Sequence, residues 1–168
     1  MAVELLKVRS AEDVEHAQEL VWEFFDVLRH RYPEMINDID AYIKDQNVAE
    51  SLDDFLTWFS PPVGECFLAR ADGQPAGIVM LKDLKDGSAE MNRMYVRKNV
   101  RGLGVGRKLC VAAINGAKDL GFKTLRLDAL HRHVEALPLY ESVGFVRYHD
   151  ADAVGGDDAR FIHMKMPL

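Results

Sequence analysis

The sequence has little cysteine and no pattern typical of a metal site. Its 168 residues include only two cysteines, Cys66 and Cys110, whose separation does not match the C-x-x-C unit of redox and zinc sites. Both stand among apolar residues, so we expect buried free thiols rather than a disulfide. The six histidines form neither an H-E-x-x-H motif nor a cysteine–histidine array. We therefore expect no metal.

Long apolar runs and an excess of positive charge are also missing. No apolar run approaches the roughly 20 residues needed to span a bilayer, and residues 1–7 lack the basic start and long apolar segment of a signal peptide. The net charge of -6 argues against a broad basic surface for nucleic acid. We expect a cytoplasmic protein that binds neither a membrane nor a nucleic acid. Its length suits a single domain over residues 1–168.

Positive charge is nevertheless concentrated in one part of the chain. Between Met91 and Lys118 there is no Asp or Glu. The basic residues there are Arg93, Arg97, Lys98, Arg101, Arg107, Lys108 and Lys118. Three alternating glycines, Gly102, Gly104 and Gly106, lie among them. A flexible backbone within a local positive charge predicts a site for a phosphorylated ligand.

These glycines lie between a predicted strand, residues 89–96, and a helical pattern that ends on Gly121. A helix that starts at such a turn directs free N–H groups and the positive end of its dipole at a bound anion. Two common phosphate motifs do not fit. A Walker loop would need glycine at Arg107 and a hydroxyl at Leu109, and a G-x-G-x-x-G fingerprint would need glycine at one of these positions. The remaining alternative is a glycine-rich turn with solvated cations.

The chain as a whole follows a mixed α/β pattern. Apolar alternation and turn residues predict strands at 3–8, 66–71, 77–84, 89–96, 124–129, 145–148 and 161–166. Helical apolar spacing predicts helices at about 11–31, 51–59, 104–120 and 134–142. The acidic stretch 35–50 is expected to be less regular. The resulting order is β-α-α-β-β-β-α-β-α-β-β.

Three motifs carry a resemblance to a known family. Arg101-x-x-Gly104-x-Gly106 is similar to the R/Q-x-x-G-x-G/A signature of the Gcn5-related N-acetyltransferases (GNAT), and residues 136–145 resemble the family's A-x-x-L-Y-x-x-x-G-F segment. Residues 90–96 resemble the fourth strand of small bacterial-type members. The resemblance implies an α/β (α+β) acyl-CoA N-acyltransferase fold, with a mixed, mostly antiparallel central sheet flanked by helices.

The resemblance also implies how acetyl-CoA would bind as cosubstrate, without a metal. Backbone groups of Met94, Tyr95 and Val96 would pair with the pantetheine arm like an added strand. The pyrophosphate would lie on the N–H groups of the turn, with charge added by basic side chains; these residues are Arg101, Gly102, Leu103, Gly104, Val105, Gly106, Arg107 and Lys108.

Two residues are expected to be catalytic by the same resemblance. Glu90 would act as general base on the amine, and Tyr140 as general acid toward the departing thiolate. The alternatives are that Glu90 faces solvent or pairs with Arg93, and that Tyr140 is an ordinary packed aromatic. His133 stands where many family members have asparagine, so a contact from that asparagine to coenzyme A does not carry over to this chain.

The acceptor is less defined. We expect a primary amine, with a small molecule favoured over a peptide N-terminus. Acidic residues before the strand at 66–71 and in the connection between the last two predicted strands would suit a cationic amine, although such residues are more often solvated. They are Asp38, Asp40, Asp45, Asp53, Asp54, Asp150, Asp152, Asp157 and Asp158. There are two alternative functions: a binding module that senses acetyl-CoA without turnover, and a nucleotide-binding protein. The sequence also allows a homodimer.

Overall fold

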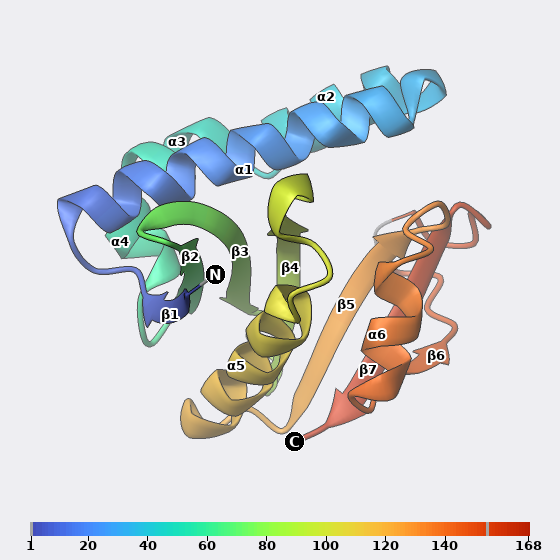
Figure 1. Ribbon diagram of the computed structural model, residues 1–168. Coiled ribbons are helices and arrows are strands. Elements are labelled where there is room, and N and C mark those ends of the chain that lie inside the picture. The colour runs from blue at the N-terminus through green and yellow to red at the C-terminus, as the bar shows by residue number, and fades with distance from the viewer. Residues whose placement is uncertain (1, 154) are drawn as a thin grey trace.

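Seven strands form one sheet through the middle of the protein (Figure 1). The computed structural model describes residues 2–153 and 155–168. The strands are β1 (Val3–Lys7), β2 (Gly64–Ala71), β3 (Gln74–Asp83), β4 (Ser88–Val96), β5 (Thr124–Leu130), β6 (Val146–Tyr148) and β7 (Phe161–Pro167). Their spatial order is β1-β2-β3-β4-β5-β7-β6, and every pair is antiparallel except β4 with β5. The predicted mixed, mostly antiparallel sheet is confirmed.

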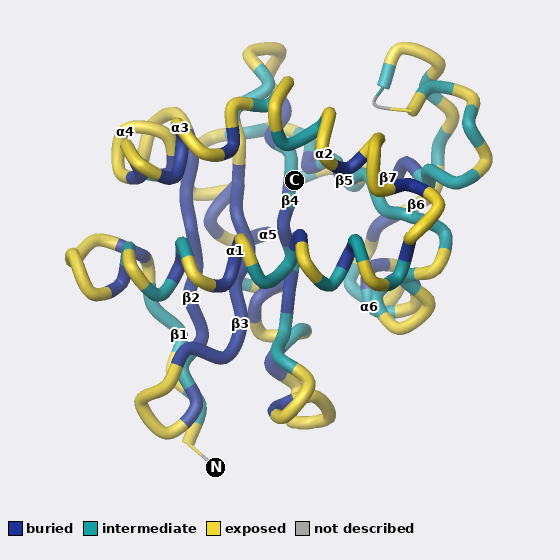
Figure 2. Tube along the Cα trace, turned by 90° about the horizontal axis from the view of Figure 1, so that it is seen from above, coloured by how far each residue is buried: buried dark blue, intermediate teal, exposed yellow. Residues whose placement is uncertain are grey.

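Helices cover both faces of this sheet. They are α1 (Ala11–Arg31), α2 (Ile36–Asp45), α3 (Val48–Asp53), α4 (Phe55–Phe59), α5 (Val105–Asp119) and α6 (Ala136–Ser142). The first four form one apolar cluster with one face of the sheet, and the last two form a second cluster with the other face. Figure 2 shows the result as dark blue, buried tube along β2, β3 and β4.

Helix α1 begins and ends where the sequence predicts. The Ser10 side chain accepts a hydrogen bond from the Asp13 backbone, and the Asp13 carboxylate accepts one from the Ser10 backbone, which together form a capping box. Asp13 also pairs with Arg70 of β2 at 2.7 Å. The helix ends at Arg31, and Pro33 starts a short 3₁₀ turn. The start of α1 is therefore fixed to the sheet as well as capped.

The prediction for residues 35–50 is wrong. Met35 is buried in the 3₁₀ turn Pro33–Met35, and α2 and α3 follow it. Ile39 and Val48 are buried in one apolar cluster with residues of α1, while the aspartates between them are exposed to solvent. A narrow apolar stripe was therefore enough to form helices beneath an acidic surface. The predicted helix 51–59 is also divided, because Asp54 leaves the helical conformation with φ of -111° and ψ of 50°.

The parallel pair at the centre of the sheet separates after a short start. Residues 88–90 of β4 pair with residues 124–126 of β5, and the pairing ends there. In Figure 1 the two strands lie close near the C-terminus and diverge toward α1. Beyond Glu90, the edge of β4 that faces β5 has no strand partner among residues 2–153 and 155–168. This divergence leaves backbone N–H and C=O groups open in the middle of the protein.

Candidate active site

A bulge in β4 changes which side chains enter this opening. Arg93 has a left-handed backbone conformation with φ of 51°, and the pairing with β3 shifts at the same place. Met91 and Met94 consequently pack on the same face, toward α5, although regular alternation would separate residues three apart. The opposite face, covered by α1 and α2, receives Glu90 and Arg93 together.

A first cavity of about 380 Å³ lies between the end of β4, the glycine turn and the start of α6. The predicted cofactor residues that line it are Met94, Tyr95, Val96, Arg101, Gly102, Gly104, Val105, Gly106 and Arg107. Leu103 and Lys108 are exposed and do not line this cavity. The cavity therefore brings together the open edge of β4 and the basic turn.

The turn itself has the geometry of an anion cradle. Gly102 and Gly104 have φ of 84° and 78°, in the region that favours glycine. Gly104 is the N-cap residue of α5 and, as a glycine, has no side chain to cap the helix. A Cβ on Gly106 would meet Leu139 at 3.4 Å and Met94 at 3.5 Å, so the backbone approaches the cavity closely. Free N–H groups of the first helical turn thus remain available for an anion.

The basic residues of the sequence run have different structural roles. Arg97 is not part of the cavity, because its guanidinium pairs with Glu23 at 2.8 Å and Glu19 at 2.6 Å on α1. Glu23 also accepts a hydrogen bond from the Tyr95 hydroxyl at 2.7 Å. Burial and this hydrogen bond raise the pKa of Tyr95 to about 12. Arg97 therefore holds α1 on the end of β4, immediately before the turn.

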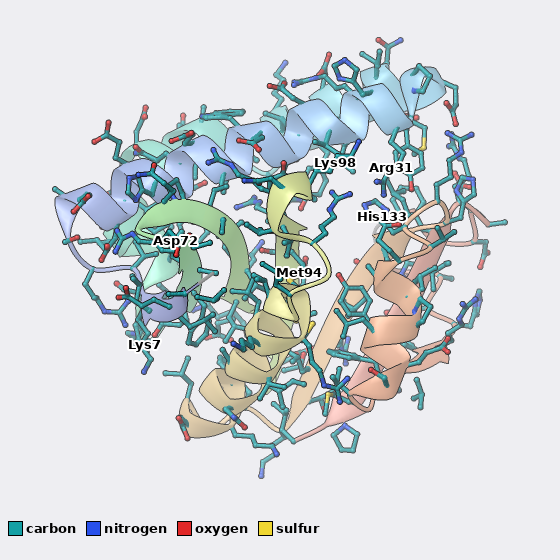
Figure 3. All side chains as sticks on the ribbon, in the orientation of Figure 1. Lys7, Arg31, Asp72, Met94, Lys98 and His133 are labelled. Carbon is teal, nitrogen blue, oxygen red and sulfur yellow. The ribbon has the colours of Figure 1, made fainter. Side chains whose placement is uncertain are left out.

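A second cavity of about 440 Å³ continues from the first, between α1, α2 and the diverging strands. Phe24, Leu28, Met94 and His133 line both cavities. Met94 and His133 lie on opposite sides of the opening between β4 and β5 (Figure 3). A ligand arm in the first cavity would therefore end where the second begins.

Both residues predicted to be catalytic, Glu90 and Tyr140, line the second cavity. Burial, followed by the negative charge of Asp128, raises the pKa of Glu90. Its carboxylate lies 3.4 Å from the Asn92 side-chain amide and in no ion pair among the described residues. Glu90 is thus a partly enclosed carboxylate at the point where the strands separate, and pairing with Arg93 at ion-pair distance is not observed.

Tyr140 reaches the cavity from α6. Its ring packs edge-to-face on Phe145 with centroids 6.0 Å apart. Burial is the main cause that raises the pKa of its phenol, which keeps the hydroxyl protonated at neutral pH. Within the described part of the chain the hydroxyl has no hydrogen-bond partner. Tyr140 therefore has a proton to donate and no protein acceptor for it.

The family assignment follows from the sequence model for these elements. The model of the acetyltransferase (GNAT) family matches residues 17–145, which include β4, the glycine turn, α5 and α6. The chain belongs to the GNAT family.

Curated relatives of this GNAT chain share part of its length. It is 35% identical over 102 residues to an uncharacterized N-acetyltransferase of Schizosaccharomyces pombe, covering 60% of this chain and 63% of that protein. It is 35% identical over 91 residues to mycothiol acetyltransferase of Thermomonospora curvata, covering 54% of this chain and 30% of that protein. The chain thus spans less than two thirds of the length of these relatives.

Solved structures extend the likeness of the GNAT fold to the whole chain. The PaiA N-acetyltransferase of Thermoplasma acidophilum, in complex with coenzyme A, has a TM-score of 0.75 at 20% identity and covers 100% of both chains. A GNAT acetyltransferase of Staphylococcus aureus has a TM-score of 0.74 at 19% identity, covering 99% of each chain. These likenesses confirm the fold predicted from the sequence.

Three groups around the GNAT cavities were not among the predicted site residues. Asp128 lines the second cavity, and its carboxylate lies 2.6 Å from Nδ1 of His163. Nε2 of His163 lies 3.2 Å from the carbonyl of Gly156, so this nitrogen must donate. Burial alone would lower the pKa of His163, but these two contacts raise it above its usual value. The contact with His163 holds the Asp128 carboxylate beside Glu90.

His133 is the third group, and sequence comparison with the family marked its position without giving it a role. Its Nδ1 lies 3.0 Å from the Tyr32 hydroxyl, and the two rings stack with centroids 5.7 Å apart. Burial lowers the pKa of His133, so the imidazole is neutral at physiological pH. The contact joins the end of α1 to the segment before α6, at the junction of the cavities.

The remaining negative predictions concern metals, cysteines and membranes. Residues 2–153 and 155–168 contain no cluster of metal-ligating side chains. Cys66 and Cys110 are free and buried, as predicted, and burial raises the pKa of Cys110 to about 12. Within the same residues, none of the helices combines the length and apolar character required to cross a bilayer.

Of the acidic residues considered for the acceptor, Asp38 and Asp45 line the second cavity.

Proposed function

We propose that the chain transfers the acetyl group of acetyl-CoA to a primary amine, by direct attack in a ternary complex. One observation carries the proposal: the open edge of β4 runs from a basic glycine turn to a second cavity that contains a half-buried carboxylate and a protonated phenol. The first cavity fits coenzyme A because Gly102 and Gly104 adopt left-handed backbone conformations and the start of α5 has no side-chain cap, so its N–H groups are free for an anion.

The residues of the first cavity would hold the cosubstrate at three places. The pantetheine arm would add to the free edge of β4 by backbone hydrogen bonds of Met94, Tyr95 and Val96. The pyrophosphate would lie at the start of α5. Arg107, whose Nη1 is 3.1 Å from the Ser142 hydroxyl, and Arg101, whose Nε is 3.1 Å from the Val96 carbonyl, would add positive charge. Bound acetyl-CoA supplies the acyl group and a thiolate leaving group.

The residues of the second cavity would move the protons. An alkyl ammonium must lose a proton before its nitrogen can attack, and Glu90 would accept it, directly or through water. A free N–H of β4 beyond the bulge would stabilise the negative charge on the carbonyl oxygen as the new N–C bond forms. Tyr140 would donate its proton to the sulfur as the C–S bond breaks, and the attacking nitrogen would return its second proton to Tyr140, directly or through water, so that the amide and free coenzyme A leave.

A thiol-release assay tests the proposal. Acetyl-CoA is mixed with the protein and a panel of primary amines, and free thiol is measured together with the acetylated product by mass. The proposal predicts stoichiometric thiol and amide with at least one class of amine. Thermal stabilisation by coenzyme A without release from any amine would favour the sensor function instead.

A further inference from the structure

The second cavity contains an arginine without a counter-charge. Arg93 is only 8% exposed, yet it forms no ion pair with residues 2–153 and 155–168, and its Nε is buried without a hydrogen-bond partner. Its Nη1 has one contact, with the sulfur of Met80 at 3.6 Å. Other buried charges are paired: Glu65 with Arg9 at 2.7 Å, and Asp13 with Arg70 at 2.7 Å. Arg93 is the exception.

The surrounding structure holds this guanidinium without an ion pair, although it lies near enough to Glu90 for its positive charge to oppose the rise in the pKa of that carboxyl. The side chain starts from the bulge in β4 and lies over the rings of Phe25, 6.0 Å from the centroid, and Phe59, 5.7 Å from the centroid. Aromatic faces stabilise the cation but leave its N–H edge unsatisfied. A buried charge without a partner is costly, and an unsatisfied buried group requires an explanation such as an absent ligand.

Arg93 also acts on the cavity from the same face as Glu90. It lines that cavity beside Tyr42 of α2, where burial raises the pKa of the phenol, and the positive charge of Arg93 and a weak hydrogen bond from it oppose the rise. Glu90 and Asp128 place negative charge in the same cavity. A ligand bound in this cavity would therefore meet both positive and negative side chains.

Most of the remaining wall is apolar. Side chains of Phe24, Leu28, Ile39, Leu130 and Phe161 line it. A ligand that satisfies every part of the wall has an ammonium group for the carboxylates, an anionic group for the guanidinium and an apolar body. A planar carboxylate suits arginine best, since it accepts two parallel N–H bonds.

We infer that the acceptor is an amino carboxylic acid with an apolar side chain, whose carboxylate binds Arg93 and whose amine lies near Glu90. This inference rests on the proposed function and names its substrate class. It assigns Arg93 as the residue that distinguishes an amino acid from a simple amine or an amide.

Matched ligand pairs test this directly. The probes are L-phenylalanine, L-methionine and 3-amino-3-phenylpropanoate, each beside its primary amide, which keeps the amine and the body but removes the charge. Binding to the protein saturated with coenzyme A is measured by calorimetry, and acetyl transfer by thiol release. At least one acid should bind, and react, about tenfold or more better than its amide. Equal values within every pair, or no binding of any acid, would overturn the inference.

Variants assign the preference to Arg93. Arg93→Met should remove the difference between acid and amide, and Arg93→Lys should keep part of it. Arg147→Met is the matched control, since Arg147 is exposed on β6 and lines neither cavity. If Arg93→Met fails to fold, the comparison of acid and amide on the unaltered protein still tests whether the site prefers a carboxylate. A preference that survives in folded Arg93→Met would contradict the inference.

The two proposals can fail separately. If no amine releases thiol but the acids bind and Arg93→Met abolishes that binding, the acetyl transfer is wrong and the carboxylate site stands. If amides and simple amines are acetylated as well as the acids, the transfer stands and the carboxylate site is wrong.

Discussion

Burial shifts the pKa of Glu90 and of Tyr140 in the same direction, with opposite chemical consequences. A raised pKa makes the Glu90 carboxylate a stronger base, whereas the Tyr140 phenol becomes a weaker acid and keeps its proton. One cavity thus contains a base and an acid, which amide formation from an ammonium and a thioester requires.

Replacement of the Tyr140 hydroxyl tests the acid. Tyr140→Phe keeps the ring and its packing on Phe145. We expect kcat to fall about 100-fold or more, because the thiolate must leave without a positioned proton, while the affinity for coenzyme A stays unchanged. Steady-state kinetics and calorimetry provide the two values. A kcat within about twofold of the unaltered enzyme, where chemistry limits the rate, would leave Tyr140 as a packing residue.

Replacement of the Glu90 carboxylate tests the base. Glu90→Gln should lower kcat/KM most at low pH, where the amine is nearly all protonated, and a rise in pH toward the pKa of the acceptor's ammonium should partly rescue it. Glu15→Gln, an exposed change on α1, is the control. Wild-type rates at every pH would remove Glu90 from the mechanism.

The same substitution should also change stability. A carboxylate whose pKa is raised by folding destabilises the folded state above that pKa, where it must carry charge. Glu90→Gln should therefore raise Tm at neutral pH, and the difference should shrink as the pH falls through the raised pKa. Thermal unfolding between pH 4 and pH 8 measures it. A lower Tm for the variant at neutral pH would show that Glu90 has a stabilising partner.

At the scale of elements, β4 and the turn into α5 determine the site. Sequence patterns predicted most strands and α5 to within two or three residues, since alternation and glycines mark their ends. The bulge at Arg93 was not predicted, because the sequence of β4 shows no break in β-propensity there. The sequence therefore indicated Glu90 and the turn, but gave no sign that Arg93 lies beside Glu90 in a cavity.

Helix α2 shows the second limit of sequence patterns. Ile39 and Tyr42 of this helix line the second cavity. Its acidic residues and short apolar stripe nevertheless resembled an irregular segment in the sequence. Asp128 and His163 lie on adjacent strands, 35 residues apart in the chain, and no local pattern marks such a pair. Residues brought together by strand pairing become visible only in the fold.

Substitutions at Gly106 test the turn. Gly106→Ala adds a Cβ that makes ordinary contacts with Leu139 and Met94, so coenzyme A should bind nearly as well. Gly106→Asp adds a negative charge at the start of α5 and should weaken binding about 100-fold or more. Gly106→Asn, equal in size but neutral, separates charge from bulk and should lie between them. Equal affinity for the Asp and Asn variants would mean that no phosphate lies at the turn.

At the scale of the whole molecule, one fold places two cavities end to end. The divergence of β4 from β5 opens the sheet, α1 and α2 cover one side, and α5 with its glycine turn lies on the other. The contacts of Glu23 with Tyr95 and Arg97 fix α1 on β4 between the cavities. The site therefore depends on the relative placement of the two layers, more than on any single element.

Titration of coenzyme A into the protein tests the central claim, that the first cavity binds this molecule through the turn before α5. Calorimetry with coenzyme A is compared with calorimetry with pantetheine, which keeps the thiol arm but lacks every phosphate. We expect one site per chain, with coenzyme A bound about 100-fold or more tightly than pantetheine. Added salt should weaken the binding of coenzyme A. Equal affinities for the two, or no binding of coenzyme A to folded protein free of copurified ligand, would contradict it.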